Sequence, residues 1–209
     1  MPAQALFATP PLEIAPDAWL LPGFAQSEAL LPHIDAVAAE AAFRYFSVPG
    51  SKQMSVAMTN CGDWGWTSNE TGYAYTSQDP LTQTPWPAMP HTFKELAREV
   101  ASTVGWRNFE PDACLVNLYS AGAGMGLHQD RHEEDLSAPI VSVSLGASAK
   151  FIIGGLRRSD SVKSIELKDG DVLVWGGRSR LLFHGVRPLP ADSPLRYNLT
   201  FRQAKSQAK

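Results

Sequence analysis

The sequence predicts a mainly β protein of the α+β class, built as a double-sheet jelly roll with two helices packed against it. Segments with helical character lie before residue 105, and short runs with strand periodicity dominate from Ala113 onward. Glycine and proline, with 16 residues each, interrupt the chain often, as expected where many short strands are joined by turns. Helices followed by about seven or eight short strands are the order expected of such a fold.

The individual elements follow from local composition and period. Residues 1–24 are rich in proline and predict an irregular, packed arm. Residues 27–43 are rich in alanine and predict a helix capped by Ser27, and residues 91–104 predict a second, amphipathic helix. The intervening residues 45–90 show almost no helical period. The strands expected after them are 113–119, 139–146, 149–153, 163–167, 171–175, 181–186 and 195–202.

Composition limits the class of protein. A chain of 209 residues with 44% hydrophobic content is expected to form one globular domain over residues 1–209. Two cysteines do not make a disulfide framework, and no apolar run reaches the length of a membrane span or a signal peptide. We therefore expect a cytoplasmic monomer without a membrane partner. The net charge of −3 argues against a protein that binds nucleic acid over its whole surface, so any such contact must be local.

The last predicted strand, residues 195–202, has two chemically different faces. At a period of two, Arg196, Asn198 and Arg202 share one face, and an aromatic and apolar face lies opposite. If the strand is interior, the two guanidiniums need anionic partners, because unpaired buried charge is very costly. A small dicarboxylate would satisfy both, since arginine binds carboxylates in a bidentate manner. The alternative is a surface strand with a solvated basic edge.

A second group of residues has the chemistry of a metal site. His128 and Asp130 are two residues apart, and His184 lies in a later predicted strand. Two histidines and one carboxylate form the facial triad of non-haem iron(II) oxygenases, which leaves coordination positions open for a co-substrate and oxygen. Taken separately, the His-x-Asp spacing can arise by chance, and His184 has the alternative role of a satisfied core histidine. The nearby basic strand supplies the anion site that an iron- and 2-oxoacid-dependent enzyme needs.

Further motifs extend this pattern from about Ser55 to Gln203. They are residues 54–62 (MSVAMTNCG), 86–90 (WPAMP), 111–114 (PDAC), 117–119 (NLY), 128–130 (HQD), 139–146 (PIVSVSLG), 170–172 (GDV), 175–177 (WGG) and 196–202 (RYNLTFR). With these motifs in this order, the chain resembles the AlkB family of iron(II)- and 2-oxoglutarate-dependent nucleic-acid dealkylases. The resemblance implies a double-stranded β-helix, with a dioxygenase core at about 113–203 and a nucleotide-recognition lid at about 45–90.

The resemblance also implies a set of metal and co-substrate residues. His128, Asp130 and His184 would bind Fe(II), and Arg196 and Arg202 would hold the two carboxylates of 2-oxoglutarate. The accessory hydrogen-bonding positions of the family match Asn117, Tyr119 and Asn198. With O2 as the second co-substrate, the family oxidises an N-methyl group and releases formaldehyde, succinate and CO2. The implied function is repair of 1-methyladenine and 3-methylcytosine in single- or double-stranded DNA, with RNA left open as a further substrate.

The substrate residues are expected in the lid and in the segment after the Asp130 ligand. A base in a duplex cannot reach a buried iron, so it must be flipped out or single-stranded and held by stacking. Trp66 matches the stacking aromatic of the family, with the His128 ring as the opposite wall. Tyr73 matches a residue that contacts the nucleotide backbone. Arg158 matches a basic residue near the strand, for which a solvated hairpin tip is the alternative.

One position departs from the family pattern. Two residues after the Asp ligand, the family has a carboxylate that contacts the exocyclic amine of the flipped base, and this chain has His132 there. A neutral histidine can accept a hydrogen bond but offers no fixed negative charge. The next residue, Glu133, is a candidate to replace the missing carboxylate in part. The departure leaves the base preference open.

Two other classes of function compete with this one. An iron(II)/2-oxoglutarate hydroxylase of a small molecule or of a protein side chain would share the metal and co-substrate residues. It would not need the aromatic segment from Trp66 to Tyr73, which therefore discriminates between the two. A jelly-roll binding module without chemistry is a third reading. The presence of His128, Asp130, Arg196 and Arg202 together argues against it.

Overall fold

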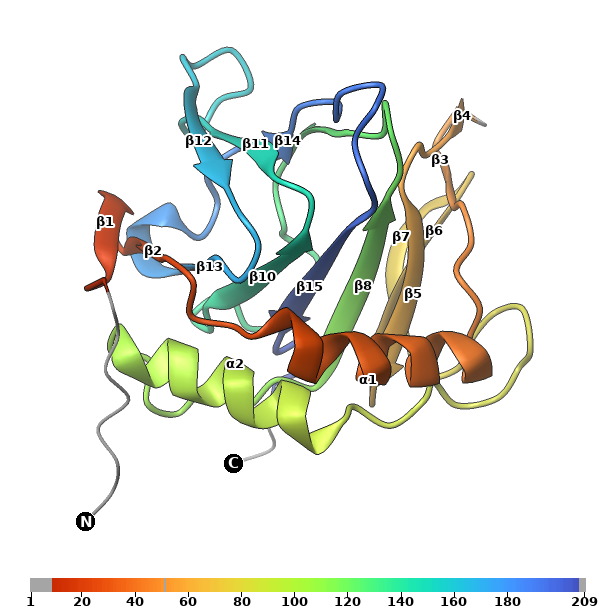
Figure 1. The fold of residues 1–209 in the computed structure, drawn as a ribbon. Helices are drawn as coiled ribbons and strands as arrows, with labels where there is room; N and C mark the ends of the chain where they lie inside the picture. Colours follow the sequence, from red (N-terminus) through yellow and green to blue (C-terminus); the bar gives the residue numbers. More distant parts are fainter. Residues whose placement is uncertain (1–8, 51, 207–209) are drawn as a thin grey trace.

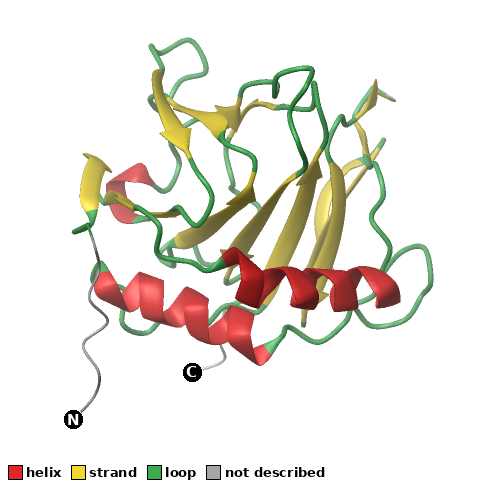
Figure 2. Cartoon of the chain, in the orientation of Figure 1, coloured by secondary structure: helices red, strands yellow, loops and turns green. Residues whose placement is uncertain are grey.

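The computed structural model describes residues 9–50 and 52–206, which form mainly strands with two helices (Figure 2). In chain order the elements are β1 Leu12–Ala15, β2 Ala18–Leu21, α1 Ser27–Glu40, β3 Ser47–Val48, β4 Lys52–Gln53, β5 Ala57–Gly62, β6 Gly65–Asn69, β7 Gly72–Thr76, α2 His91–Thr103, β8 Ala113–Tyr119, β9 Met125–His128, β10 Ile140–Gly146, β11 Ala149–Ile153, β12 Lys163–Leu167, β13 Val172–Trp175, the 3-10 turn η1 Gly177–Ser179, β14 His184–Val186 and β15 Arg196–Arg202. None of the described helices is long and apolar enough to cross a membrane.

Two antiparallel sheets form the core of the molecule. The larger has seven strands in the order β1-β2-β13-β10-β15-β8-β5, and the smaller has four in the order β12-β11-β14-β9. Both helices cover one face of the larger sheet, and the smaller sheet lies on its other side (Figure 1). One apolar cluster fills the space beneath the helices, and a second fills the space between the sheets. This arrangement confirms the predicted double-sheet jelly roll buttressed by helices.

Strand β15 lies in the middle of the larger sheet, between β10 and β8. Leu199 and Phe201 point into the apolar cluster beneath the helices, where Phe201 meets the ring of Phe93 edge to face. The alternate residues, Arg196 and Arg202 among them, line a cavity between the two sheets. The strand is therefore interior, and the alternative of a solvated basic edge is wrong.

Some local predictions at the N-terminal end were wrong. The predicted irregular arm contains strands β1 and β2, and β2 joins the larger sheet by pairing with β13; residues 1–8 of the arm lie outside the described residues. Ser27 does not cap α1, because its hydroxyl donates to the Asp169 carboxylate and Gln26 occupies the capping position. The helix also ends at Glu40, before the predicted residue 43, because the backbone is extended at Ala41.

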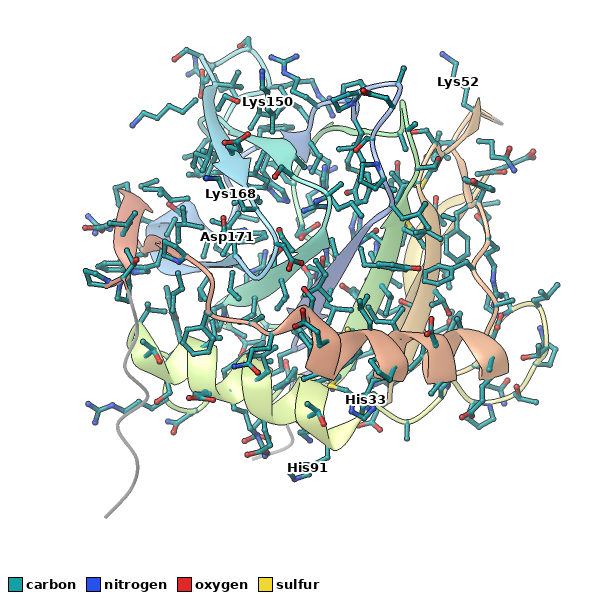
Figure 3. All side chains as sticks on the ribbon, in the orientation of Figure 1. His33, Lys52, His91, Lys150, Lys168 and Asp171 are labelled. Carbon is teal, nitrogen blue, oxygen red and sulfur yellow. The ribbon has the colours of Figure 1, made fainter. Side chains whose placement is uncertain are left out.

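Residues 45–90 hold strands β3 to β7. Strand β5 closes the edge of the larger sheet against β8, while β3 pairs with β4 and β6 pairs with β7. The β6–β7 hairpin is attached to β5 by the Asn60 side chain, which donates to the Trp66 carbonyl and accepts from the Trp66 N–H. A bidentate ion pair between Arg44 and Asp79 holds the loop that follows β7. Lys52 on β4 projects from the end of the molecule opposite His33 and His91 on the helices (Figure 3).

Candidate metal, co-substrate and base site

The three predicted metal ligands converge between the two sheets. His128, at the end of β9, is the direct cross-strand partner of His184 on β14, and their ring centroids are 4.4 Å apart. Asp130 lies just past the end of β9, with its carboxylate oxygens 3.7 Å from His128 Nε2 and 3.8 Å from His184 Nε2. One ligand atom from each residue lies within 4.8 Å of the others. Two imidazole nitrogens and one carboxylate at this spacing suit Fe(II).

Backbone carbonyls fix which nitrogen of each histidine faces the site. Nδ1 of His128 lies 2.8 Å from the Gly126 carbonyl oxygen, and Nδ1 of His184 lies 3.0 Å from that of Leu182. A carbonyl only accepts hydrogen bonds, so each Nδ1 carries the proton. Each Nε2 then keeps a lone pair directed at the Asp130 side of the site, which is the arrangement found in metal-binding histidines.

The charges around the triad keep the ligands in their metal-binding forms. Burial alone would raise the pKa of Asp130, but the Arg202 guanidinium and the two histidines outweigh it and lower that pKa below the usual range. Burial, with the neighbouring His128, lowers the pKa of His184 to about 4. Both shifts favour an ionised carboxylate and a neutral imidazole at neutral pH. A cation can therefore bind without first displacing a proton from either group.

The predicted 2-oxoglutarate residues line a small inner cavity of 60 Å³ beside the triad. Arg196 is 1% exposed, and its guanidinium lies 4.9 Å from the centre of the Tyr119 ring. Arg196 Nη2 donates to Ser144, but Nε and Nη1 have no hydrogen-bond partner among the described residues, and neither does Oδ1 of Asn117. The two guanidinium nitrogens are donors, whereas the amide oxygen is an acceptor, and buried unpaired donors are costly unless a ligand satisfies them. A carboxylate of 2-oxoglutarate fits them, so the residues present suit the co-substrate.

An outer cavity of 560 Å³ lies on the other side of the triad. Trp66, Tyr73, His132 and Arg158 all line it, and His128 lines both cavities. The Trp66 and Tyr73 rings are stacked with centroids 5.6 Å apart, and the Tyr73 ring lies 5.3 Å from that of His132. The Arg158 guanidinium covers the Phe183 ring at 5.2 Å. The structure therefore brings four of the five predicted substrate residues to one cavity that has a metal ligand in its wall.

The fifth predicted substrate residue, Glu133, lies elsewhere. It is not among the residues that line the outer cavity, and its side chain is only 2% exposed. Its carboxylate accepts hydrogen bonds from Tyr75 and from Arg180. Arg180 and Tyr75 were not predicted from the sequence, because an arginine in a glycine-rich turn and a tyrosine in a short hairpin are usually exposed. In the sequence, only the position of Glu133 close to Asp130 pointed to this group of residues.

Comparisons with known proteins agree with this geometry. The description "2OG-Fe(II) oxygenase superfamily" belongs to the family model that matches residues 17–202. The AlkB dioxygenase of Salmonella typhimurium is 52% identical over 198 residues, which cover 91% of this chain and 92% of that protein. The AlkB dioxygenase of Escherichia coli is 53% identical over 186 residues, covering 87% and 86%. The structure of OsALKBH1 superposes with a TM-score of 0.78 at 27% identity, over 93% of this chain and 100% of that one.

The fold and the triad thus define an iron(II)- and 2-oxoglutarate-dependent dioxygenase, with O2 as the second co-substrate. Within that class, the chain belongs to the AlkB family. The resemblance to the AlkB family, which was predicted from the sequence motifs, is confirmed. Oxidative dealkylation of nucleic-acid bases is the activity that follows, and the reading as a binding module without chemistry is wrong.

Proposed function

We propose that this protein removes N-linked methyl groups from 1-methyladenine and 3-methylcytosine in DNA. The observation that carries the proposal is the position of the stacked Trp66 and Tyr73 rings. They line a cavity that has the His128 ligand in its wall, so a base held against them faces the metal. A hydroxylase of a small molecule or a protein side chain has no need of such an aromatic wall, and nothing else in the site favours that alternative.

The outer cavity has the chemistry to hold a flipped, methylated base. A ring methylated on nitrogen is cationic or easily protonated, and the electron-rich faces of Trp66 and Tyr73 attract it more than an unmodified ring. Arg131 and Arg158 also line this cavity and supply positive charge for the flanking phosphates. Because the overall charge is −3, the rest of the surface does not favour phosphate, and phosphate binding is confined to the entrance of the outer cavity.

The inner cavity holds the co-substrate in the proposed reaction. Arg196 receives one carboxylate of 2-oxoglutarate and Arg202 the other, while Asn117, Tyr119 and Asn198 surround the chain between them. When Fe(II) is bound by the triad, it supplies the activation of O2 that couples oxidation of 2-oxoglutarate to hydroxylation of the N-methyl carbon. The resulting N–CH2OH group loses formaldehyde. The balance is N–CH3, 2-oxoglutarate and O2 giving N–H, formaldehyde, succinate and CO2.

The test is release of formaldehyde and succinate from oligonucleotides that carry one methylated base. Equal amounts of the two products, dependent on Fe(II), 2-oxoglutarate and the methyl group, are the expected result. Trp66→Ala should raise the KM for the oligonucleotide without changing the KM for 2-oxoglutarate. Equal succinate release with methylated and unmethylated oligonucleotides would contradict the proposal. Parallel DNA and RNA substrates measure the preference between them, and gel filtration tests the predicted monomer.

A further inference from the structure

Behind the metal site, buried charged groups from three separate segments form one network. Glu133 accepts a hydrogen bond from Tyr75 Oη at 2.6 Å and one from Arg180 Nη2 at 2.9 Å. Arg202 Nε lies 3.4 Å from the same carboxylate, while Arg202 Nη2 donates to Asp130 Oδ2 at 2.7 Å. The side chains of Glu133, Arg180 and Arg202 are 2%, 4% and 7% exposed. Solvent therefore screens these charges very little.

The two arginines and two carboxylates of this network balance one another. Arg202 is shared between Asp130, the proposed metal ligand, and Glu133, so each carboxylate limits how far the guanidinium moves toward the other. Without the charge of Glu133, Arg202 would have only Asp130 to neutralise it. It would then be drawn toward the metal ligand and away from a carboxylate of the co-substrate.

Arg180 extends this control to the backbone. Its Nη1 donates to the Asp130 carbonyl at 2.5 Å and its Nε donates to the Ala138 carbonyl at 3.1 Å. Arg180 thus ties the start and the end of the segment that carries Glu133, and Glu133 neutralises Arg180 in return. Removing either charge leaves the other buried without its partner, which is strongly unfavourable.

We propose that Glu133 is a positioning residue for co-substrate binding, which holds Arg202 in place together with Arg180 and Tyr75, and that it does not read the base. The inference rests on the proposed role of Arg202 in binding 2-oxoglutarate. Tyr75 lies on β7, in the hairpin that also supplies Trp66 and Tyr73. The wall of the outer cavity and the arginine of the inner cavity are therefore attached to the same carboxylate.

The test measures 2-oxoglutarate binding without nucleic acid, so that base recognition cannot contribute. Isothermal titration of Mn(II)-loaded protein with 2-oxoglutarate gives the Kd without turnover. Glu133→Gln, which keeps the shape and removes the charge, should raise this Kd about tenfold, because a buried charge-assisted contact is lost. The matched control is Glu134→Gln. Glu134 is the next residue, half exposed and paired with Lys205, and its replacement should leave the Kd unchanged.

Tyr75→Phe is the second variant, because it removes one hydrogen bond to Glu133 and leaves every charge in place. It should raise the Kd for 2-oxoglutarate by about two- to fivefold. If Glu133→Gln does not fold, Tyr75→Phe tests the proposal in its place. Thermal unfolding of the metal-free protein shows whether each variant is folded. If Glu133 and Tyr75 contributed to stability alone, the variants would have lower melting temperatures, but the folded proteins would keep the wild-type Kd for 2-oxoglutarate.

The outcomes separate the inference from the function on which it rests. Equal Kd values for the wild type, Glu133→Gln and Tyr75→Phe would overturn the inference alone. A Glu133→Gln variant with an unchanged Kd and a raised KM for the methylated oligonucleotide would return Glu133 to base recognition. A wild-type protein that fails to bind 2-oxoglutarate would overturn the proposed function, and the inference with it.

Discussion

The guanidinium of Arg196 lies against the ring of Tyr119, 4.9 Å from its centre, in the middle of the protein. Two of its nitrogens have no hydrogen-bond partner among the described residues. The cation is thus held by Tyr119 and one serine hydroxyl, with part of its hydrogen-bonding capacity directed at the inner cavity. A buried group kept in this state destabilises the protein until a ligand satisfies it.

Arg196→Met should therefore separate stability from binding. Methionine fills similar space without a buried charge, so the free energy of unfolding of the ligand-free protein should rise by about 1 kcal/mol or more. With Mn(II) present throughout, added 2-oxoglutarate should raise the melting temperature of the wild type but not of the variant. Thermal unfolding of the metal-free protein, and of the Mn(II)-loaded protein with and without 2-oxoglutarate, measures both effects. Arg107→Met, at an exposed site, is the control, and a less stable Arg196→Met protein would contradict the expectation.

Replacement of the metal ligands should reveal that Asp130 has two roles and His128 one. His128 is 37% exposed, so His128→Ala should abolish Mn(II) binding with little change in melting temperature. Asp130→Ala should abolish metal binding too, and should also destabilise the metal-free protein by about 3 kcal/mol. The reason is that Arg202 loses the carboxylate 2.7 Å from it. Titration calorimetry and thermal unfolding in metal-free buffer test both; similar melting temperatures for the two variants would refute the second role.

Base preference should depend on His132. The ring is exposed beside Tyr73 at the outer cavity, whereas Glu133 is buried and unable to replace the carboxylate that the family has at position 132. His132→Asp should therefore change the ratio of kcat/KM for 1-methyladenine to that for 3-methylcytosine. The change in this ratio should correspond to about 1–3 kcal/mol, the range for one altered contact. His91→Asp, on helix α2, is the matched control (Figure 3). Identical ratios in all three proteins would mean that position 132 does not contact the base.

The ion pair between Arg44 and Asp79 should give the loop after β7 a pH-dependent stability. Burial raises the pKa of Asp79, but the hydrogen bonds from Arg44 and the Leu81 N–H outweigh it and lower that pKa below its usual value of 3.8. A carboxyl whose pKa is lowered by folding stabilises the fold above its unfolded-state pKa and loses that effect as the pH falls through its folded value.

Asp79→Asn should accordingly destabilise the protein at pH 7, by about 1–3 kcal/mol, because the pair is partly buried and loses one charge. The difference in melting temperature from the wild type should shrink as the pH falls from 5 to 3. A difference that stays constant over this range would show that the charge of Asp79 does not carry the effect.

Most strands from Ala113 onward were predictable because each combines a period of two with a nearby turn. The exception is β9, Met125–His128, which was not among the expected strands. The strand expected at 181–186 begins only at His184, because the chain is still leaving the 3-10 turn at Gly177–Ser179 in the residues before that strand. Strands β1 and β2 could not be found from local pattern. They have four residues each, and β2 is ordered by pairing with β13, which lies far along the chain.

The site divides in the same way. Residue type and spacing identified the triad and the basic face of β15, because few other functions use that combination. The network of Tyr75, Glu133 and Arg180 was not predictable, since its members come from three segments and each resembles a surface residue when read alone. Only the packing of those segments reveals that the charges neutralise one another.

The direct pairing of His184 with His128 gives the metal site a place in the folding of the protein. The two histidines meet only when β14 pairs with β9, which is a contact between segments far apart in the chain. Gly185 permits that pairing, since a Cβ there would lie 2.6 Å from the Met125 carbonyl oxygen. An incompletely folded chain therefore lacks the complete set of ligands, so tight binding of the metal requires the finished fold, and the metal in turn stabilises that fold.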